Sequence, residues 1–303
     1  MKGFMGLIKR NLLIYFKDIQ AVIFSLLTSI IVFVLYLLFI KSTFVDSIND
    51  FLIGLESLVD SKDIDTLVSC ILLTGVLGSA MITVPFNCLS TIVNDKEKKI
   101  DYDICATPMK RWQIIFAYFL SATISSIIIT GFILTIGIGM LSMNGSVYLT
   151  LELAMMAYGI VILGSLSSTA LFMILMMFFK TTSASGAFFG MLSAASGFVI
   201  GAYMPLSNFS KNIQTVCSLF PATHVTALMR TAVMGGVLDH INDSIGGLDN
   251  GAFADGIKDA FTFNLTVFDN KFSNQNMTFY IIAIFVISAL VMMALYSKTY
   301  KRK

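Results

Sequence analysis

The chain has 303 residues, of which 56% are hydrophobic and only 13% are charged, and its formal net charge is +2. Soluble domains carry about 25% charged residues, so this composition excludes an ordinary soluble globular protein. Four cysteines without C-x-x-C spacing and two histidines support neither a disulfide framework nor a zinc site. We expect no bound metal and no nucleic-acid partner.

Residues 1–20 are predicted to form an amphipathic helix that lies in the plane of the membrane interface. Apolar side chains recur at helical spacing on one face, and basic side chains gather on the other, as an interfacial helix beside anionic lipid requires. The apolar face holds Phe4, Ile8, Leu12, Tyr15 and Ile19, and the polar face holds Lys2, Lys9, Arg10, Lys17 and Gln20. The alternative is a basic overhang of the first span, which does not explain the regular apolar face.

Six long apolar stretches follow, and each has about the 20 residues that span a bilayer core at ~1.5 Å rise per residue. They cover residues 21–40, 67–93, 114–141, 151–179, 185–204 and 277–296. Only Glu152 falls within these limits as a formal charge, and it lies at a predicted helix start. The predicted fold is therefore all-α: a polytopic membrane protein with six transmembrane helices, which form a single transmembrane domain over residues 1–303.

The basic residues gather on one side of the predicted membrane. The first 20 residues, the loop 94–113, Lys180 and the tail 297–303 hold 14 of the 20 basic residues and 5 acidic ones, whereas the other side holds 6 basic and 13 acidic residues. Basic residues beside span ends mark the cytoplasmic face. We therefore expect a multi-pass protein of the cell membrane with both termini in the cytoplasm. An odd number of spans is the alternative, and it would leave one basic terminus outside.

The second predicted span carries a polar patch, formed by Thr83, Asn87 and Ser90. Because an amide that faces lipid is costly, we predict that these three residues line a translocation path. Close helix packing through small residues is the alternative. No Asp, Glu, Lys or Arg lies near the patch within the span, whereas ion-coupled carriers usually keep such a residue. The expected cargo is therefore amphipathic or hydrophobic, such as a drug, antibiotic, toxin or lipid-like molecule.

The loop 94–113 is the most specific local feature of the sequence. It begins with a short mixed-charge helix that offers both apolar and ionic contacts to a cytoplasmic partner. The contact residues that we expect are Asp95, Glu97, Ile100, Asp101, Tyr102 and Ile104. Thr107 is predicted as the N-cap of the third span, with Pro108 at its first helical position. A simple positive-inside anchor is the alternative, and it would explain Lys110 and Arg111 but not the acidic residues.

Residues 205–276 form a large block that is not predicted to span the membrane. Its first part is too short and polar for two spans but too apolar for a solvated loop. Pro221 breaks the backbone hydrogen-bond ladder and divides this part into two helical pieces, Asn208–Leu219 and Ala222–Met234. We predict an extracellular re-entrant helical hairpin that is buried against protein, followed from Leu238 by an exposed loop or small cap.

Two strings in the chain resemble motifs of the ABC-2-type permeases, the membrane subunits of ATP-binding cassette (ABC) exporters. The first, after an acidic and basic run, is Ala106-Thr107-Pro108-Met109-Lys110-Arg111-Trp112, and the second is Ser218-Leu219-Phe220-Pro221-Ala222-Thr223-His224, with Leu228 and Arg230 following. The order of parts along the whole chain is also similar to that family. We assign Pro221, His224 and Arg230 to the outer hairpin, where His224 is expected to shape the structure and to do no chemistry.

The resemblance implies that the chain is half of a membrane pore: the permease subunit of an exporter, of the kind that confers multidrug resistance. Two copies, or this chain and a close relative, are expected to pair with two copies of an ABC ATPase subunit, and the loop 94–113 would act as the coupling loop. The sequence has no G-x-x-x-x-G-K-[ST] loop to hold nucleotide phosphates. We therefore expect that the chain is not an enzyme and binds no cofactor, and that ATP and Mg bind to the partner ATPase.

Two other classes of protein stay open at this stage. An ion-coupled secondary transporter should show two related halves with broken helices, and no convincing internal repeat or charged coupling site is evident. A membrane-embedded enzyme would need clustered carboxylates, histidines or cysteines near one membrane face. The acidic residues of the outer segment 41–66, where a short extracellular helix is predicted, are scattered and have no metal-ligand spacing.

Overall fold

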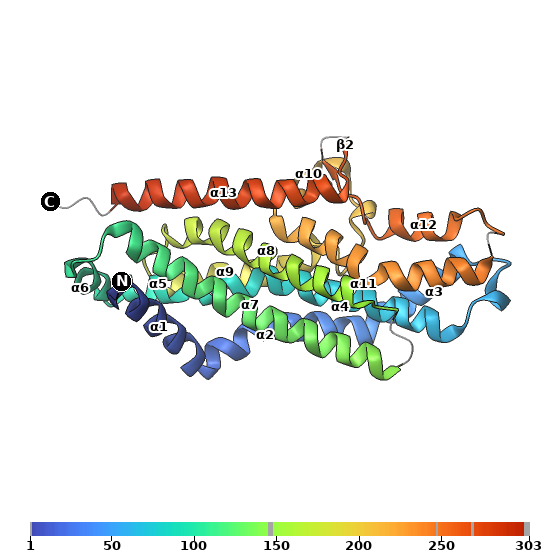
Figure 1. Cartoon of the computed structure of the whole chain (residues 1–303), viewed down its shortest axis with the longest axis horizontal. Helices are drawn as coiled ribbons and strands as arrows, with labels where there is room; N and C mark the ends of the chain where they lie inside the picture. Colours follow the sequence, from blue (N-terminus) through green and yellow to red (C-terminus); the bar gives the residue numbers. More distant parts are fainter. Residues whose placement is uncertain (1, 145–147, 247, 268–269, 300–303) are drawn as a thin grey trace.

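The computed structural model describes residues 2–144, 148–246, 248–267 and 270–299. Its long helices run side by side along the longest axis, which gives an elongated helical bundle (Figure 1). Both described ends of the chain lie at the same end of this bundle. We name this the basic end, after the basic residues of α1 (Lys2–Lys17) and of the segment 94–113. The opposite end, which carries α3 (Lys41–Phe51) and α12 (Ala252–Ala260), is named the acidic end.

The first two helices meet at a sharp break. α1 ends at Lys17, and α2 (Ile19–Leu35) begins after Asp18, whose side chain accepts a hydrogen bond from the backbone N–H of Ala21 at 3.0 Å. This N-cap satisfies a free N–H of the first helical turn. α2 then continues through a π-helical turn (Tyr36–Ile40) into α3. The first predicted span and the outer helix after it are therefore one continuous helix.

The elements that follow are helices, short turns and one small hairpin. They are a 3₁₀ turn (Glu56–Leu58), α4 (Ser61–Cys88), α5 (Ser90–Glu97), α6 (Ile100–Ala106), α7 (Arg111–Asn144), α8 (Leu151–Met176), α9 (Thr182–Val199), a 3₁₀ turn (Leu206–Asn208), α10 (Lys211–Ser218), α11 (Pro221–Ile245), α12, β1 (Thr266–Val267), β2 (Asn270–Lys271) and α13 (Asn274–Thr299). β1 and β2 pair antiparallel, with Thr266 opposite Lys271 and Val267 opposite Asn270.

α4 is the central helix of the bundle. α2, α7, α8, α9 and α11 all pack against it, and most of its side chains are buried, as expected of a helix that is apolar all round. Asp60 caps its first turn by accepting from the N–H of Lys62 at 3.0 Å. Pro85 lies inside its last turn, and the chain then continues as α5.

The structure supports a multi-pass membrane protein. Five helical segments of the described chain are long and apolar enough to cross a membrane: Ile19–Phe51, Ser61–Glu97, Arg111–Met143, Leu151–Met176 and Asn274–Leu295. The remaining predicted span, 185–204, corresponds to α9, which is rich in serine and glycine and ends before Gly201 takes a left-handed conformation (φ 70°). Its 18 residues reach about 27 Å, slightly less than the ~30 Å of a bilayer core. A sixth crossing therefore stays a prediction.

The block 205–276 is more ordered than predicted. α11 starts at Pro221, where a missing N–H is harmless, but it does not end at Met234. It continues through two glycines to Ile245, because its buried face packs against α4 and α8. The exposed loop predicted from Leu238 is therefore wrong over its first part, and α12 with the β-hairpin follows as a small cap. The re-entry of this block into the bilayer stays a prediction.

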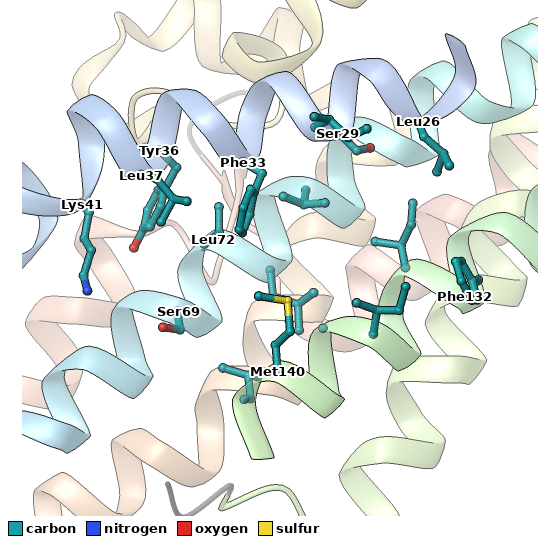
Figure 2. Close-up of a pocket in the computed structure, with 17 residues that line it drawn as sticks. Leu26, Ser29, Phe33, Tyr36, Leu37, Lys41, Ser69, Leu72, Phe132 and Met140 are labelled. Atoms are coloured by element: carbon teal, nitrogen blue, oxygen red, sulfur yellow. The ribbon is translucent and has the colours of Figure 1, made fainter. Parts of the chain in front are cut away.

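A groove opens between α2, α4 and α7 (Figure 2). Side chains of the three helices line a cavity of about 420 Å³. Its lining is apolar except for Ser29, Tyr36, Lys41 and Ser69. The packing of α2 and α7 on the same central helix therefore leaves a space between them.

On another side of α4, a glycine lets α11 approach closely. A Cβ built on Gly78 of α4 would lie 2.1 Å from Oγ1 of Thr226 on α11 and 2.9 Å from Cδ1 of Ile200. Small residues permit such close contact between helices in a membrane. The central pair of helices therefore depends on the missing side chain at Gly78.

We expect Gly78→Ala to destabilise the bundle. The new methyl group would collide with Thr226 and Ile200, and overpacking a core typically costs about 1–3 kcal/mol. Thermal unfolding of the purified protein should show a lower midpoint. The matched control is Gly131→Ala in α7, where no described neighbour lies within 4 Å of the new Cβ, and its midpoint should be unchanged or slightly higher. Equal midpoints for the two variants would contradict the close approach of α4 and α11.

Candidate functional site

The segment 94–106 folds into the end of α5 and the short helix α6 at the basic end of the bundle (Figure 1). Lys99 joins the two helices in a left-handed conformation (φ 61°), so the charged run does not form one continuous helix. Two aspartates lie in the first turn of α6, where the helix dipole favours negative charge. Thr107 follows the helix, and its hydroxyl donates to the carbonyl of Ile104 at 2.6 Å.

The helix of the third span starts three residues after the predicted first helical position, Pro108. Thr107 closes α6 instead of capping the next helix, and α7 begins at Arg111. The side chain of Gln113 accepts a hydrogen bond from the backbone N–H of Lys110 at 2.9 Å. A residue three positions after the cap supplies this bond in a capping box. Pro108 therefore lies in the turn between the two helices.

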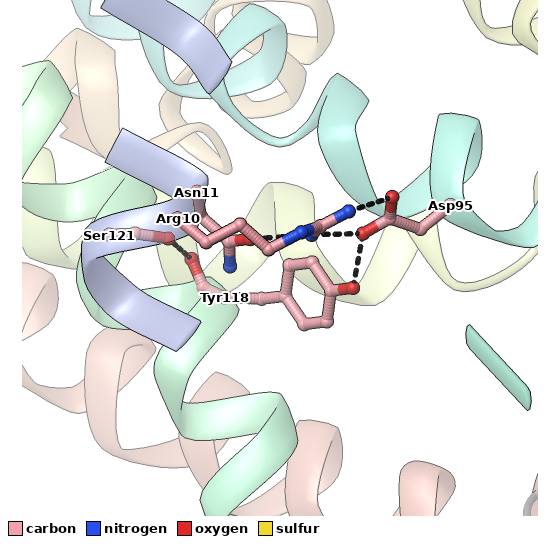
Figure 3. A network of polar contacts seen from close by, with 5 residues as sticks. All are labelled: Arg10, Asn11, Asp95, Tyr118 and Ser121. Atoms are coloured by element: carbon pink, nitrogen blue, oxygen red, sulfur yellow. Dashed lines mark hydrogen bonds and ion pairs between the residues drawn. The ribbon is translucent and has the colours of Figure 1, made fainter. Parts of the chain in front are cut away.

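A buried carboxylate joins three helices at this end, as Figure 3 shows. Asp95 of α5 is 2% exposed and accepts one hydrogen bond from each terminal nitrogen of Arg10 on α1, both at 2.7 Å. Its Oδ2 also accepts from the hydroxyl of Tyr118 on α7 at 2.5 Å. Bidentate bonds between a guanidinium and a carboxylate are among the strongest in proteins because both partners are charged.

Charge compensation explains why Asp95 can be buried. A carboxylate that leaves water is costly unless an opposite charge and hydrogen bonds replace its hydration, and Arg10 and Tyr118 supply both. The hydrogen bonds with Asp95 raise the pKa of Arg10 above its ordinary value. This ion pair therefore binds α1 to α5, while the tyrosine binds α7 to the same carboxylate.

The two residues after Asp95 fasten α5 to the turn between α8 and α9. Nζ of Lys96 donates to the carbonyl of Met177 at the end of α8, at 2.9 Å. Glu97 accepts from the backbone N–H of Thr182 at the start of α9 (2.9 Å) and from its hydroxyl (2.5 Å). A cation at a helix C-terminus and an anion at a helix N-terminus both match the helix dipole. We name Asp95, Lys96 and Glu97 the α5 clamp.

Only part of the predicted contact surface is accessible. Asp95 and Ile104 are buried, so the expectation that they face a partner is wrong: Asp95 is held by Arg10, and Ile104 packs into the core. The other predicted contacts are Glu97 and Tyr102, which are exposed, and Ile100 and Asp101, which are half-buried. The side chain of Tyr102 is 69% exposed.

The sequence does not reveal the partners of the α5 clamp. Its amphipathic pattern predicts Arg10 on the face of α1 that turns to lipid headgroups, whereas the structure turns this side chain to Asp95. No local pattern in the sequence marks Tyr118 or Thr182 as a contact of the α5 clamp. Arg10 and Asp95 are 85 positions apart, and so are Glu97 and Thr182. Periodicity and motif spacing describe neighbours along the chain, so they cannot pair residues at this separation.

One residue of the predicted polar patch, Asn87, joins α4 to α2. Thr83 is fully buried, and its hydroxyl donates to a carbonyl one turn earlier at 3.1 Å. Nδ2 of Asn87 donates to the carbonyl of Ala21 and to Oγ of Ser25 on α2, both at 2.7 Å. Ser90 lies at the start of α5. None of the three residues lines the cavity between α2, α4 and α7, and their place in a translocation path stays a prediction.

The residues assigned to the outer hairpin make contacts that hold helices together. His224 of α11 is fully buried; its Nε2 lies 2.8 Å from the last carbonyl of α10, and its ring stacks on Tyr280 of α13 with 4.2 Å between centroids. Arg230 is also buried and donates to the carbonyls of Phe261 and Gly201. These carbonyls follow α12 and α9, at the helix ends where a cation is favoured.

Comparison with known protein families matches most of the chain. The matching family is described as ABC-2 family transporter protein, and the match covers residues 46–298. The α5 clamp and α6 lie inside this range, whereas α1 and α2 precede it. A search of curated proteins found no match.

We expect Asp95→Asn to loosen α1 from the bundle. The variant removes the charge from the bonds with Arg10, and a hydrogen bond to a charged group is worth about 1.5–3 kcal/mol. Amide hydrogen exchange of residues 2–17, measured by mass spectrometry, should become at least about tenfold faster. Asp103→Asn is the matched control, because Asp103 is exposed on α6, and it should leave this exchange unchanged. The same slow exchange in both variants would show that the ion pair does not hold α1.

Proposed function

The chain belongs to the ABC-2 family of transporter proteins, and from this membership we propose that it is the permease subunit of an ABC exporter. In this proposal a separate ATPase subunit binds ATP and Mg and hydrolyses the nucleotide. The permease converts that reaction into a rearrangement of its helices. The cargo is an amphipathic or hydrophobic compound that leaves the cell.

One observation carries the coupling step of this proposal: α6 is exposed, while the segment before it is tied to four other helices. Tyr102 on α6 is 69% exposed, and tyrosines are enriched among the anchors of protein interfaces. A partner that moves α6 also moves α5, and the α5 clamp passes this motion to α1, α7, α8 and α9. Such a contiguous set of contacts is a physical route between a docking site and the spans.

The chemistry of the spans supports the proposed cargo class. The central parts of the predicted spans contain no Asp, Glu, Lys or Arg, whereas ion-coupled carriers keep ionisable residues in the membrane. A path between such helices suits a compound that is itself largely apolar. The assignment of ATP hydrolysis to another subunit rests on family membership and agrees with the lack of a G-x-x-x-x-G-K-[ST] loop in this sequence.

The proposed assembly has two permeases, which are two copies of this chain or this chain and a close relative, and two ATPase subunits. In this arrangement the basic end faces the cytoplasm of the cell, as basic residues beside span ends favour. α6 then lies on the side of the membrane where ATP is available, and both termini are cytoplasmic.

A photoreactive residue in place of Tyr102 tests the proposed docking site. In membranes of the native host, irradiation should join the chain to a protein that carries a G-x-x-x-x-G-K-[ST] loop, identified by mass spectrometry of the joined peptides. The control is the same probe in place of Leu248, which is 71% exposed at the acidic end, and it should not capture that protein. Capture at both positions, or at neither, would contradict docking at α6.

We further expect Tyr102→Ala to weaken the complex with the ATPase by about fivefold to thirtyfold, because the loss of a large interface anchor typically costs about 1–2 kcal/mol. Co-purification from detergent extract at graded ATPase concentration measures the change. Leu248→Ala is the control, because it truncates a similarly exposed side chain at the other end. Since both side chains are exposed, the unfolding midpoint of the permease should stay the same in both variants. Unchanged affinity in Tyr102→Ala would refute its role as an anchor.

A further inference from the structure

Two cavities of different character adjoin at the groove between α2, α4 and α7. The first, of about 420 Å³, is the largely apolar one that Figure 2 shows. The second, of about 300 Å³, is lined by Lys41, Lys62, Asp65, Thr66, Ser69 and Leu141. Both are lined by Lys41, Ser69 and Leu141. The two cavities therefore adjoin at these residues, and we call the first the apolar part and the second the polar part of the groove.

Specific contacts with α4 shape this groove. The hydroxyl of Tyr36, in the π-helical turn, donates to the carbonyl of Val68 on α4 at 2.5 Å. On the other wall, a Cβ built on Gly137 of α7 would lie 2.1 Å from Cδ1 of Leu73 on α4. α2 and α7 are therefore each placed by α4, and the groove is the space that remains between them. A turn of π-helix inside an α-helix is rare and frequently occurs at a functional site.

The apolar part is long enough for a lipid chain. Along the continuous helix of α2 and α3 it extends from Leu26 to Lys41, which is about 22 Å at 1.5 Å per residue. The hydrocarbon of one leaflet is about half of the ~30 Å bilayer core, or about 15 Å, so the groove can hold an acyl chain over its full length. The groove runs along the helices, as Figure 2 shows between Leu26 and Lys41, and therefore along the direction of lipid chains in a membrane.

The polar part carries a net positive charge. Nζ of Lys41 lies 3.1 Å from Oδ1 of Asp65, and Lys62 adds a second ammonium group. Two cations and one carboxylate leave one positive charge, which complements a phosphate monoanion. Lys41 directly follows the first predicted span, at the level where lysine side chains reach lipid headgroups.

We propose that this groove binds one phospholipid, with an acyl chain between α2 and α7 and its phosphate between Lys41 and Lys62. A molecule that joins an apolar chain to an anionic head fits a site with one apolar part and one cationic end. The lipid comes from the leaflet at the acidic end of the bundle. The site stands apart from the proposed function, because its test needs neither ATP nor the ATPase.

Native mass spectrometry of the full chain, purified in detergent and incubated with phosphatidylglycerol, tests the site. The wild-type protein should keep one bound lipid per chain. The double variant Lys41→Ala, Lys62→Ala should bind the lipid about thirtyfold more weakly. Each lysine near an anionic headgroup strengthens binding by about fivefold to sixfold, and the two effects multiply. Ile136→Trp, at a half-exposed position of the groove, should displace the chain and also lower the bound fraction.

Matched variants control for charge and for bulk. Lys271→Ala removes a lysine from another exposed Lys–Asp pair, with Asp259 at 3.3 Å, and Leu290→Trp adds a ring to the exposed face of α13. Both should bind the lipid as the wild type does. Exposed ion pairs contribute little to stability, so the lysine variants should fold, and Lys41→Arg should keep the lipid because it keeps the charge.

Three outcomes would overturn the proposal. The groove variants could keep the lipid as well as the two controls do. Diacylglycerol with the same chains could bind as tightly as phosphatidylglycerol, which would mean that the lysines do not hold a phosphate. Ile136→Trp could disrupt a dimer of the chain without loss of bound lipid, which would mean that a second copy covers the groove.

Discussion

A polar group inside this bundle is stabilised by a partner within the protein, because hydrocarbon offers none. This constraint explains the contacts that join its helices. Asn87 of α4 reaches a carbonyl and a hydroxyl of α2, Tyr36 of α2 reaches a carbonyl of α4, and Arg230 of α11 donates to carbonyls that follow two other helices. Apolar contact has no direction, so these bonds decide how the helices are rotated and at what depth they meet.

At the basic end the same constraint produces the α5 clamp. Asp95 is buried, so its charge must be balanced, and Arg10 can balance it only if α1 lies against α5. Breaking such a pair leaves an uncompensated buried charge, which costs more than the pair itself contributes. Lys96 and Glu97 meanwhile satisfy the free carbonyl and N–H groups at the ends of α8 and α9. α5 therefore connects four helices, and one of them, α1, lies outside the family match.

The structure agrees with sequence-based prediction where the signal is local and departs from it where the partner is distant. Long apolar runs and Pro221 are local signals, and five predicted spans and the start of α11 lie where these signals place them. The end of α11 was unpredictable, because two glycines that cost roughly 1 kcal/mol each by helix propensity are outweighed by packing against α4 and α8. The contacts of Asp95 and Asn87 could not be predicted from the sequence either, since their partners lie 85 and 66 positions away.

The groove lies where the facing sides of two helices are largely apolar and need no polar partner. Where two helix faces are apolar, lipid satisfies them as well as protein does, so nothing draws α2 and α7 together once each is placed by α4. α7 is a single helix that carries Tyr118 at the α5 clamp and Gly137 in the wall of the groove. These residues are about 28 Å apart along the helix at 1.5 Å per residue. The contact of Tyr118 with Asp95 and the wall of the groove are therefore parts of one helix, so a tilt of α7 at Tyr118 would change the width of the groove at the other end.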